Sequence, residues 1–428
     1  KRFFTGNNPM VKKDTLCGVC NNKKLVTGKI DIPTKFYVTS SPFFFENLDD
    51  KNAYKSFGMC QDCYQKVMVG ISKVKKNYSN RLFNELRYYV IPKSISNNSS
   101  YERELELIQD ILSGKGESYK ESIKTISSVN KSNSRKRSNL KVDFLFWRPD
   151  QASFIVLDTI DDVSYKHIQN VFSTLYHINR SSFGSSNISG KYNLKFSDLR
   201  WLLFPNYKSH NSPDPKLYRK EILNLFDSIL KSKRVDYKYL IKQFNYILRK
   251  RHFKNRNSFE DIIANPLKMN VMLSWLDQIT ELKGGFKVDE GNYFTEIEDS
   301  DINEFFEAHS EIYKNNYYRQ GLFLLGKLMN EVLKEQQKEN KSANILNKLS
   351  FDGMPVRRVK KFVKDVTEIL NIYDKYGNNQ LLHSQMMDRL QGIENSSLNK
   401  DEVVFYILSG ISFGRYLGHK YSKNKEEN

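Results

Sequence analysis

The four cysteines of the chain form two C-x-x-C pairs, Cys17-Gly-Val-Cys20 and Cys60-Gln-Asp-Cys63. Two residues between cysteines allow both thiolates to reach one ion, and four thiolates complete a tetrahedral site without an open position. Because the two pairs contain every cysteine of the sequence, we predict a structural zinc site that ties residues 17–63 together. The alternatives are a redox pair, unrelated thiols or an iron–sulfur cluster.

A helix predicted over residues 355–375 separates apolar from basic side chains. At about 100° per residue, seven apolar residues between Val356 and Leu370 fall on one arc. The opposite arc carries four cations, which precede the first acid of the helix: Arg357, Lys360, Lys361 and Lys364. These cations repel one another unless they are solvated or face phosphate. The helix is therefore a candidate nucleic-acid contact, and a solvated face is the alternative.

A second basic cluster lies at the end of a helix predicted over residues 236–253. Its candidate phosphate-binding residues are Arg249, Lys250, Arg251 and Lys254. Cations at this position also complement the carbonyl end of a helix, so a structural role is an equal alternative. Basic residues spread over several segments favour a surface that follows a phosphate backbone over a single helix that reads bases.

Motifs of catalysis give little support for an enzyme. The segment from Gly321 to Lys327 matches the first seven positions of a phosphate-binding loop, but Leu328 replaces the serine or threonine that would bind magnesium. Its apolar spacing predicts instead a buried helix whose small residues permit close packing. Asp150 and Asp158 lie in a predicted hairpin without the nearby lysine typical of a metal-dependent nuclease. We expect a protein without catalytic activity.

The composition favours an anionic partner. Lys and Arg total 68 against 49 Asp and Glu, which gives a formal net charge of +19. The 28 Phe and 25 Tyr residues argue against a disordered basic tail. No apolar run reaches the length of about 18 residues that a membrane span needs, and no secretory signal opens the chain, so we expect a cytoplasmic protein. The chain does not begin with Met, and we expect a further segment before it.

The first half of the chain mixes strands and helices. Residues 1–80 hold the cysteine pairs and a strand-like aromatic stretch at 35–45. Two strand-like runs at 141–147 and 153–157 predict a β-hairpin. Residues 114–139 are rich in Ser, Lys and Asn, which predicts a flexible linker.

From Pro266 onward the periodicity predicts almost only helices, over 267–283, 301–315, 317–338, 355–375, 380–391 and 400–420. The predicted fold class is therefore α+β, a β-containing N-terminal body with a four-cysteine zinc motif followed by a mainly α-helical C-terminal bundle. We expect three segments: a zinc-stapled segment at 1–80, a mixed α+β body at 81–262, and the helical bundle at 263–428.

Three features carry a family resemblance. The first is the pair of C-x-x-C motifs, with the second in the context Met59-Cys60-Gln-Asp-Cys63-Tyr64. The second is Phe154-Ile-Val-Leu157 followed by Ile160-Asp-Asp-Val163. The third is Arg319-Gln-Gly-Leu-Phe-Leu-Leu-Gly326-Lys-Leu328, with Phe405-Tyr-Ile-Leu-Ser-Gly410 near the end. Together they resemble the large subunit of type I-B CRISPR Cascade effector complexes, over most of the chain.

The resemblance implies a non-enzymatic, DNA-binding subunit of an RNA-guided surveillance complex. Such a subunit contributes to adjacent-motif recognition and R-loop stabilisation, and it recruits a separate helicase-nuclease. The implied partners are guide RNA, target DNA, the helicase-nuclease, and other Cascade subunits, including the repeated backbone subunit and small subunits. The bundle at 263–428 would resemble the small subunit, which can also be made from an internal start such as Met269 or Met272. The basic arc at 357–364 would face the guide–target duplex or the displaced strand.

Two other classes of function stay open at this point. One is a metal-dependent nucleic-acid enzyme, for which Asp158 is the residue to test. The other is an unrelated zinc-containing basic scaffold or membrane-surface protein, which would bind anionic vesicles without affinity for DNA.

Overall fold

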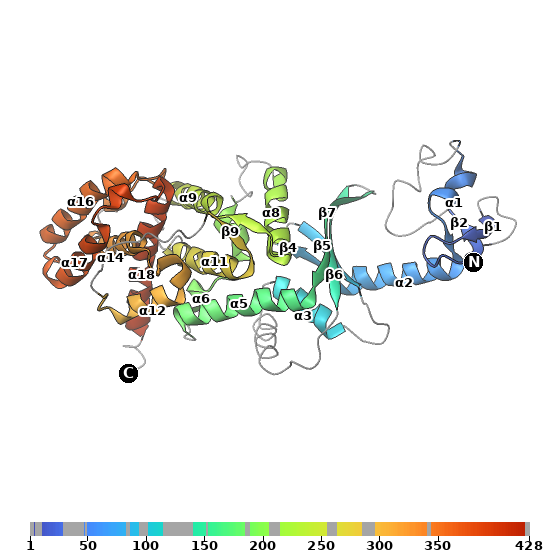
Figure 1. The fold of residues 1–428 in the computed structure, drawn as a ribbon, viewed down its shortest axis with the longest axis horizontal. Coiled ribbons are helices and arrows are strands. Elements are labelled where there is room, and N and C mark those ends of the chain that lie inside the picture. The colour runs from blue at the N-terminus through green and yellow to red at the C-terminus, as the bar shows by residue number, and fades with distance from the viewer. Residues whose placement is uncertain are drawn as a thin grey trace. The chain divides into compact units, whose positions relative to one another are not determined.

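Over the residues that it describes, the computed structural model contains many helices and three small sheets (Figure 1). The described residues are 4, 11–28, 47, 49–82, 86–93, 102–113, 140–150, 153–184, 189–204, 215–254, 263–284, 296–339 and 344–423. The strand-like stretch expected at 35–45 and the linker expected at 114–139 lie outside these residues.

The chain divides into two compact units. Unit 1 comprises residues 1–119 and 136–166, and unit 2 comprises residues 120–135 and 167–428. These units do not coincide with the three segments expected from the sequence, and that segmentation stays a prediction.

The N-terminal part of unit 1 is a small antiparallel sheet around the cysteines. Its elements are β1 (Val11–Leu16), β2 (Lys23–Thr27), the 3₁₀ turn η5 (Asp50–Asn52), α1 (Ala53–Ser56) and β3 (Met59–Cys60). The strands pair in the order β1-β2-β3. We call residues 11–28 and 49–63 the four-cysteine lobe. Gly58 permits the close approach of its strands, because a Cβ atom there would lie 2.4 Å from Cγ1 of Val26.

Unit 1 continues through a long helix into a four-stranded antiparallel sheet of order β4-β5-β6-β7. The elements are α2 (Gln61–Asn77), β4 (Ser79–Leu82), β5 (Leu86–Lys93), α3 (Glu102–Ser113), β6 (Lys141–Asp150) and β7 (Ser153–Ser164). β6 and β7 form the predicted hairpin. From Val142 to Trp147 buried and half-buried side chains alternate, as expected for a strand with one face in the core.

The first part of unit 2 is helical, with one short parallel strand pair. Its elements are α5 (Tyr165–Phe183, beginning in unit 1), α6 (Ser189–Tyr192), α7 (Asp198–Leu203), α8 (Pro215–Leu230), β8 (Arg234–Asp236), α9 (Tyr237–Lys254), α11 (Asn265–Ile279) and β9 (Glu281–Lys283). The helix expected over 267–283 therefore ends early. Thr280 is extended, and the next three residues pair with β8. That pairing is tertiary, so local periodicity did not reveal it.

The C-terminal part of unit 2 is the helical bundle. It contains α12 (Ser300–Ala308), α13 (Ser310–Tyr313), α14 (Tyr317–Lys338), α15 (Asn344–Lys348), η6 (Val356–Arg358), α16 (Val359–Ile372), η7 (Gly377–Asn379), α17 (Gln380–Leu390), η8 (Ile393–Asn395) and α18 (Lys400–Lys423). The helix expected over 301–315 breaks at His309, whose ring is hydrogen-bonded by the hydroxyls of Ser182 and Ser274. The predicted α+β class is confirmed.

α14 and α18 pack against each other in the bundle (Figure 1). Glycines lie at their closest approach. A Cβ atom at Gly326 would lie 2.0 Å from the carbonyl oxygen of Ile407. One at Gly410 would lie 1.8 Å from that of Phe323. Since such distances are sterically forbidden, only glycine permits this helix contact. The prediction of a buried helix with small residues at its packing face is confirmed.

The start of α18 carries a reciprocal cap that continues into the core. The side chain of Asn399 accepts hydrogen bonds from the backbone N–H groups of Asp401 and Glu402, and Glu402 accepts one from the N–H of Asn399. Glu402 also accepts hydrogen bonds from the buried Arg319 and Tyr237. The cap thus joins three helices through buried polar contacts. None of the described helices is long and apolar enough to cross a membrane.

Candidate metal centre and nucleic-acid interface

The four cysteines meet in the four-cysteine lobe. Cys17 and Cys20 lie in the turn between β1 and β2, Cys60 ends β3, and Cys63 lies in the first turn of α2. Their Sγ atoms all lie within 4.8 Å of one another. The turn closes because the backbone N–H of Asn21 donates to the carbonyl of Cys17 at 2.9 Å, with Asn21 in the left-handed region at φ 56°.

Backbone N–H groups around Cys17 favour its thiolate. The N–H of Cys60 lies 3.3 Å from the Sγ atom of Cys17. Burial opposes ionisation of Cys17, but hydrogen bonds from the backbone of Cys20, Cys60 and Val19 outweigh it and lower the pKa to about 6. Burial, followed by hydrogen bonds among the thiols, raises the pKa of Cys63 to about 12. A bound cation would supply the charge that the remaining thiols need to ionise.

The donor set suits a tetrahedral metal ion. In a zinc tetrathiolate, bonds of about 2.3 Å place the sulfur atoms roughly 3.8 Å apart. The observed grouping within 4.8 Å is close to this arrangement. α2 begins at Gln61, so its positive N-terminal end lies beside the thiols. Within the residues that the structure describes, these cysteines form the one group of three or more side chains able to share a metal.

α16 and the turn before it separate buried apolar side chains from exposed cations, as predicted. All four predicted cations are exposed, namely Arg357, Lys360, Lys361 and Lys364, and Arg358 in the turn before α16 is exposed as well. Two of them have acidic partners that the sequence pattern did not reveal: Lys360 lies 2.7 Å from Glu394, and Lys364 lies 3.7 Å from Glu368. Over the described residues, Arg357 and Lys361 have no ion-pair partner. We call the four predicted cations the α16 face.

The second predicted cluster does not form one patch. Arg249 forms an ion pair with Asp352, and Arg251 donates a hydrogen bond to the carbonyl of Trp201. The ammonium group of Lys250 lies 4.6 Å from the ring centroid of Tyr246. Consecutive residues of a helix point about 100° apart, which is why neighbours in the sequence take separate partners. The side chain of Lys254 lies outside the described residues.

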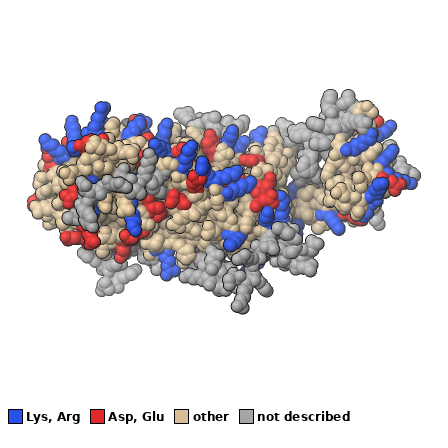
Figure 2. Space-filling model, viewed as in Figure 1, with Lys and Arg blue, Asp and Glu red and all other residues tan. Residues whose placement is uncertain are grey.

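Charge is distributed unevenly over the visible surface. Lys and Arg side chains gather along the upper edge of unit 2 in Figure 2, in the region where Figure 1 labels α16 and α9. Acidic side chains are interspersed among them, so the edge is a basic strip and not a uniform cationic face.

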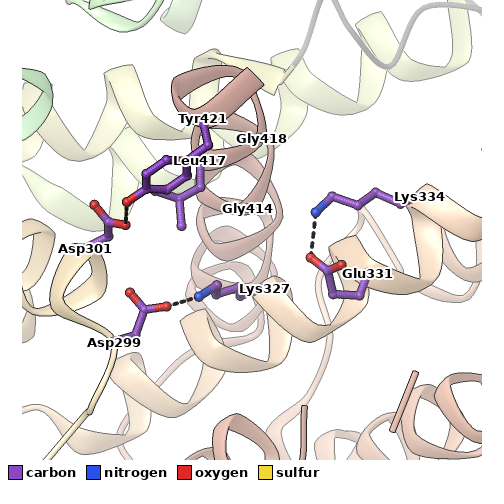
Figure 3. A pocket seen from close by; sticks show the side chains of 9 residues that line it. All are labelled: Asp299, Asp301, Lys327, Glu331, Lys334, Gly414, Leu417, Gly418 and Tyr421. Carbon is purple, nitrogen blue, oxygen red and sulfur yellow. Dashed lines mark hydrogen bonds and ion pairs between the residues drawn. The ribbon is translucent and has the colours of Figure 1, made fainter. Parts of the chain in front are cut away.

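A shallow polar pocket of about 280 Å³ lies between the N-terminal end of α12 and the helices α14 and α18 (Figure 3). Asp299 forms an ion pair with Lys327, and Glu331 forms one with Lys334 at 2.8 Å. Asp301 accepts hydrogen bonds from Lys420 and Tyr421. The acids that line the pocket are thus already paired with side chains of the same wall. We therefore do not treat the pocket as a ligand site.

Two segments with catalytic spacing are structural. The loop-like match from Gly321 to Lys327 lies inside α14. Gly410-Ile-Ser-Phe-Gly414 has the G-x-S-x-G spacing of a nucleophile elbow, which the sequence reading missed, but Ser412 is buried in the middle of α18. Lys93, at the end of the neighbouring strand β5, lies 2.9 Å from Asp143 on β6 and 3.5 Å from Asp162 on β7. Asp158 is exposed on β7.

Comparison with protein families identifies the class of the chain. Residues 14–163 match the central domain of the CRISPR-associated protein TM1802 (cas_TM1802), and residues 194–425 match its C-terminal domain. The gap between these matches contains the boundary between units 1 and 2. The chain therefore belongs to the TM1802 family of CRISPR-associated proteins. A search of curated proteins gives no significant match.

Proposed function

We propose that the chain is the non-catalytic, DNA-binding large subunit of a type I-B Cascade complex in the cytoplasm. The observation that carries the proposal is the α16 face, a row of exposed cations on a helix whose other side is buried, in a protein of a CRISPR-associated family. The net charge of +19 supports an anionic partner.

Each region has a role in this proposal. The four cysteines hold a structural zinc ion that keeps the four-cysteine lobe folded. The α16 face contacts the phosphate backbone of the guide–target duplex or of the displaced strand, and the α9 cations add further contacts. The subunit contributes to adjacent-motif recognition and R-loop stabilisation. Guide RNA pairing reads the target, and a helicase-nuclease that the complex recruits performs the cleavage.

The first experiment is a tagged pull-down from native host lysate, with the bound RNA sequenced and the partner proteins identified. Repeat-derived guide RNA together with a repeated backbone subunit and small subunits is the expected result. Protein without RNA or partners would contradict the proposal. Metal-dependent cleavage of DNA by the purified chain, abolished by Asp158→Ala, would replace it with a nuclease function.

The second experiment tests the α16 face directly. The double variant Arg357→Glu with Lys361→Glu reverses the two cations of the α16 face that have no acidic partner among the described residues. We expect normal folding, at least tenfold weaker DNA retention and a shallower dependence of affinity on salt, because phosphate contacts release counterions. The control is Lys283→Glu with Lys314→Glu, two exposed lysines on other elements of unit 2. Equal retention by the two double variants would refute the assignment of the α16 face.

A further inference from the structure

The exposed side of α9 has an unusual composition. Over residues 237–252, whose side chains the structure describes, every exposed residue is a cation or a tyrosine. The six are Lys238, Tyr239, Lys242, Tyr246, Arg249 and Lys250. At about 100° per residue they occupy an arc of roughly 120°. We call this arc the α9 face.

The two tyrosines of the α9 face present their rings to solvent. Tyr239 is 43% exposed and Tyr246 is 37% exposed, whereas most aromatic side chains of the bundle are buried. They lie seven residues apart, which places them on the same side of the helix and about 10 Å apart along its axis. The ammonium group of Lys250 lies 4.6 Å from the ring centroid of Tyr246. A cation therefore lies over the ring of Tyr246, and Lys238 and Lys242 are exposed on the same side of the helix as Tyr239.

Negative charge near the α9 face is sparse. α9 itself contains no acid after its cap residue, Asp236. The acids close to the face come from other elements: Asp352 pairs with Arg249, and Glu221 raises the pKa of Tyr239, after the larger effect of burial. Lys238 and Lys242 have no acidic partner in the described parts of the chain.

The geometry points to unpaired bases of a single-stranded nucleic acid as the ligand of the α9 face. This inference rests on the proposed function and names the substrate class of one site. Single strands are held by cationic surfaces that follow phosphates and by aromatic rings on which bases stack. The α9 face has both elements, whereas the α16 face has cations without an aromatic residue.

An anionic membrane is the competing ligand for a basic helix. The apolar side of such a helix must enter the lipid, but the apolar side of α9 is committed to the protein core. Tyr237, Leu240, Ile241 and Phe244 are at most 1% exposed. What remains at the surface is lysine, arginine and tyrosine, which suits phosphates and bases better than lipid chains.

The test compares two single strands of equal charge. The full chain is titrated with a fluorescent 20-nucleotide oligothymidine and with an abasic strand of the same length, because both carry phosphates but only the first can stack. We expect the wild type to prefer the oligothymidine by tenfold or more. The variant Tyr239→Ser with Tyr246→Ser should lose this preference and keep its affinity for the abasic strand. Tyr239→Phe with Tyr246→Phe should retain the preference, since phenyl rings stack as well. All three proteins should fold, but the serine variant should melt at a somewhat lower temperature than the other two, because more than half of each tyrosine side chain is covered.

Three results would overturn the inference. Equal binding of the two strands by the wild type would show that rings do not contribute, and a preference that survives in the serine variant would place stacking elsewhere. Binding to phosphatidylserine vesicles without a preference for the oligothymidine would favour the membrane. In each case the Arg357→Glu with Lys361→Glu variant separates the outcomes: if it still weakens DNA retention, the proposed function stands and only the assignment of the α9 face fails.

Discussion

The four-cysteine lobe and the α14–α18 bundle are stabilised in different ways. In the lobe the buried cluster consists of Cys17, Val26, Cys60 and Cys63, so three of its four residues are potential metal ligands. In the bundle, α14 alone buries 13 of its 22 residues, most of them apolar. We propose that a small lobe with so little apolar burial needs a bound metal ion to fold. The bundle, in contrast, has a full hydrophobic core.

The two regions also differ in the side chains that they expose. The basic faces of unit 2 lie on α9 and α16, two helices whose other sides are buried among apolar side chains. The lobe carries exposed apolar residues beside its cysteines, with Leu16 58% and Val19 49% exposed. Loss of the metal should therefore affect the lobe and leave the basic faces of unit 2 intact.

The largest effect is expected from Cys60→Ser. Structural zinc contributes on the order of 10 kcal/mol to the folding of small zinc domains, so the lobe should unfold and the zinc content should fall from one per chain to near zero. Elemental analysis and limited proteolysis measure both effects. Asp62→Asn, at an exposed position beside the ligands, is the control and should keep its zinc. A zinc-free variant with an unchanged protease pattern would show that the lobe does not need the metal.

The second prediction concerns the contact between α14 and α18. Gly410→Ala should destabilise unit 2 by about 3 kcal/mol, because overpacking a tight contact forces the two backbones apart. Gly418→Ala in the same helix is the matched control, since no atom lies within 4 Å of its Cβ position. It should be neutral or stabilise by up to about 1 kcal/mol through helix propensity. Urea denaturation measures both, and equal effects would contradict the proposed role of the close approach.

The third prediction is a dependence of stability on pH. Burial lowers the pKa of His309 to about 3, from an ordinary value of 6.5. Between these two pH values the unfolded chain therefore binds one more proton than the folded chain. The contribution of neutral His309 to the free energy of unfolding is complete above pH 6.5 and decreases as the pH falls toward 3. The slope is about 1.4 kcal/mol per pH unit.

The test is to measure the free energy of unfolding of the wild type and of His309→Gln at pH 7 and at pH 4.5, and to compare how much stability each protein loses between the two. The variant cannot gain the proton, so its loss of stability should be smaller by about 2 to 3 kcal/mol. Other groups titrate equally in the two proteins and cancel in the comparison. Identical losses would mean that His309 is already protonated or hydrated in the folded state.

The smallest effect on stability is expected at the surface of the bundle. Glu394→Gln removes the acid that pairs with the exposed Lys360. Exposed ion pairs contribute little to stability, so the melting temperature should not change. DNA affinity should rise by a few-fold at low salt, since Lys360 gains freedom to meet phosphate. Unchanged affinity would show that Lys360 does not contact DNA.

The long elements with clear periodicity were predictable from the sequence. The hairpin of β6 and β7, the helix α14 and the segregated faces of α16 are found where their patterns place them. Three features were not predictable, because their causes are distant in the chain. The parallel pair β8–β9 ended α11 early, the serines around His309 accompany the break between α12 and α13, and Glu394 paired with a lysine on α16.

By itself the sequence determined the donor set of the candidate metal site, since two C-x-x-C pairs leave few other uses for four cysteines. It also determined the net charge and the apolar and basic arcs of α16, because these follow from composition and from the helical period. Only the tertiary structure decided that the Sγ atoms gather within 4.8 Å. It also decided that Arg249, Lys250 and Arg251 have separate partners and that two tyrosines of α9 are partly exposed to solvent. Exposure depends on which side of a helix the rest of the fold covers, and no local pattern contains that information.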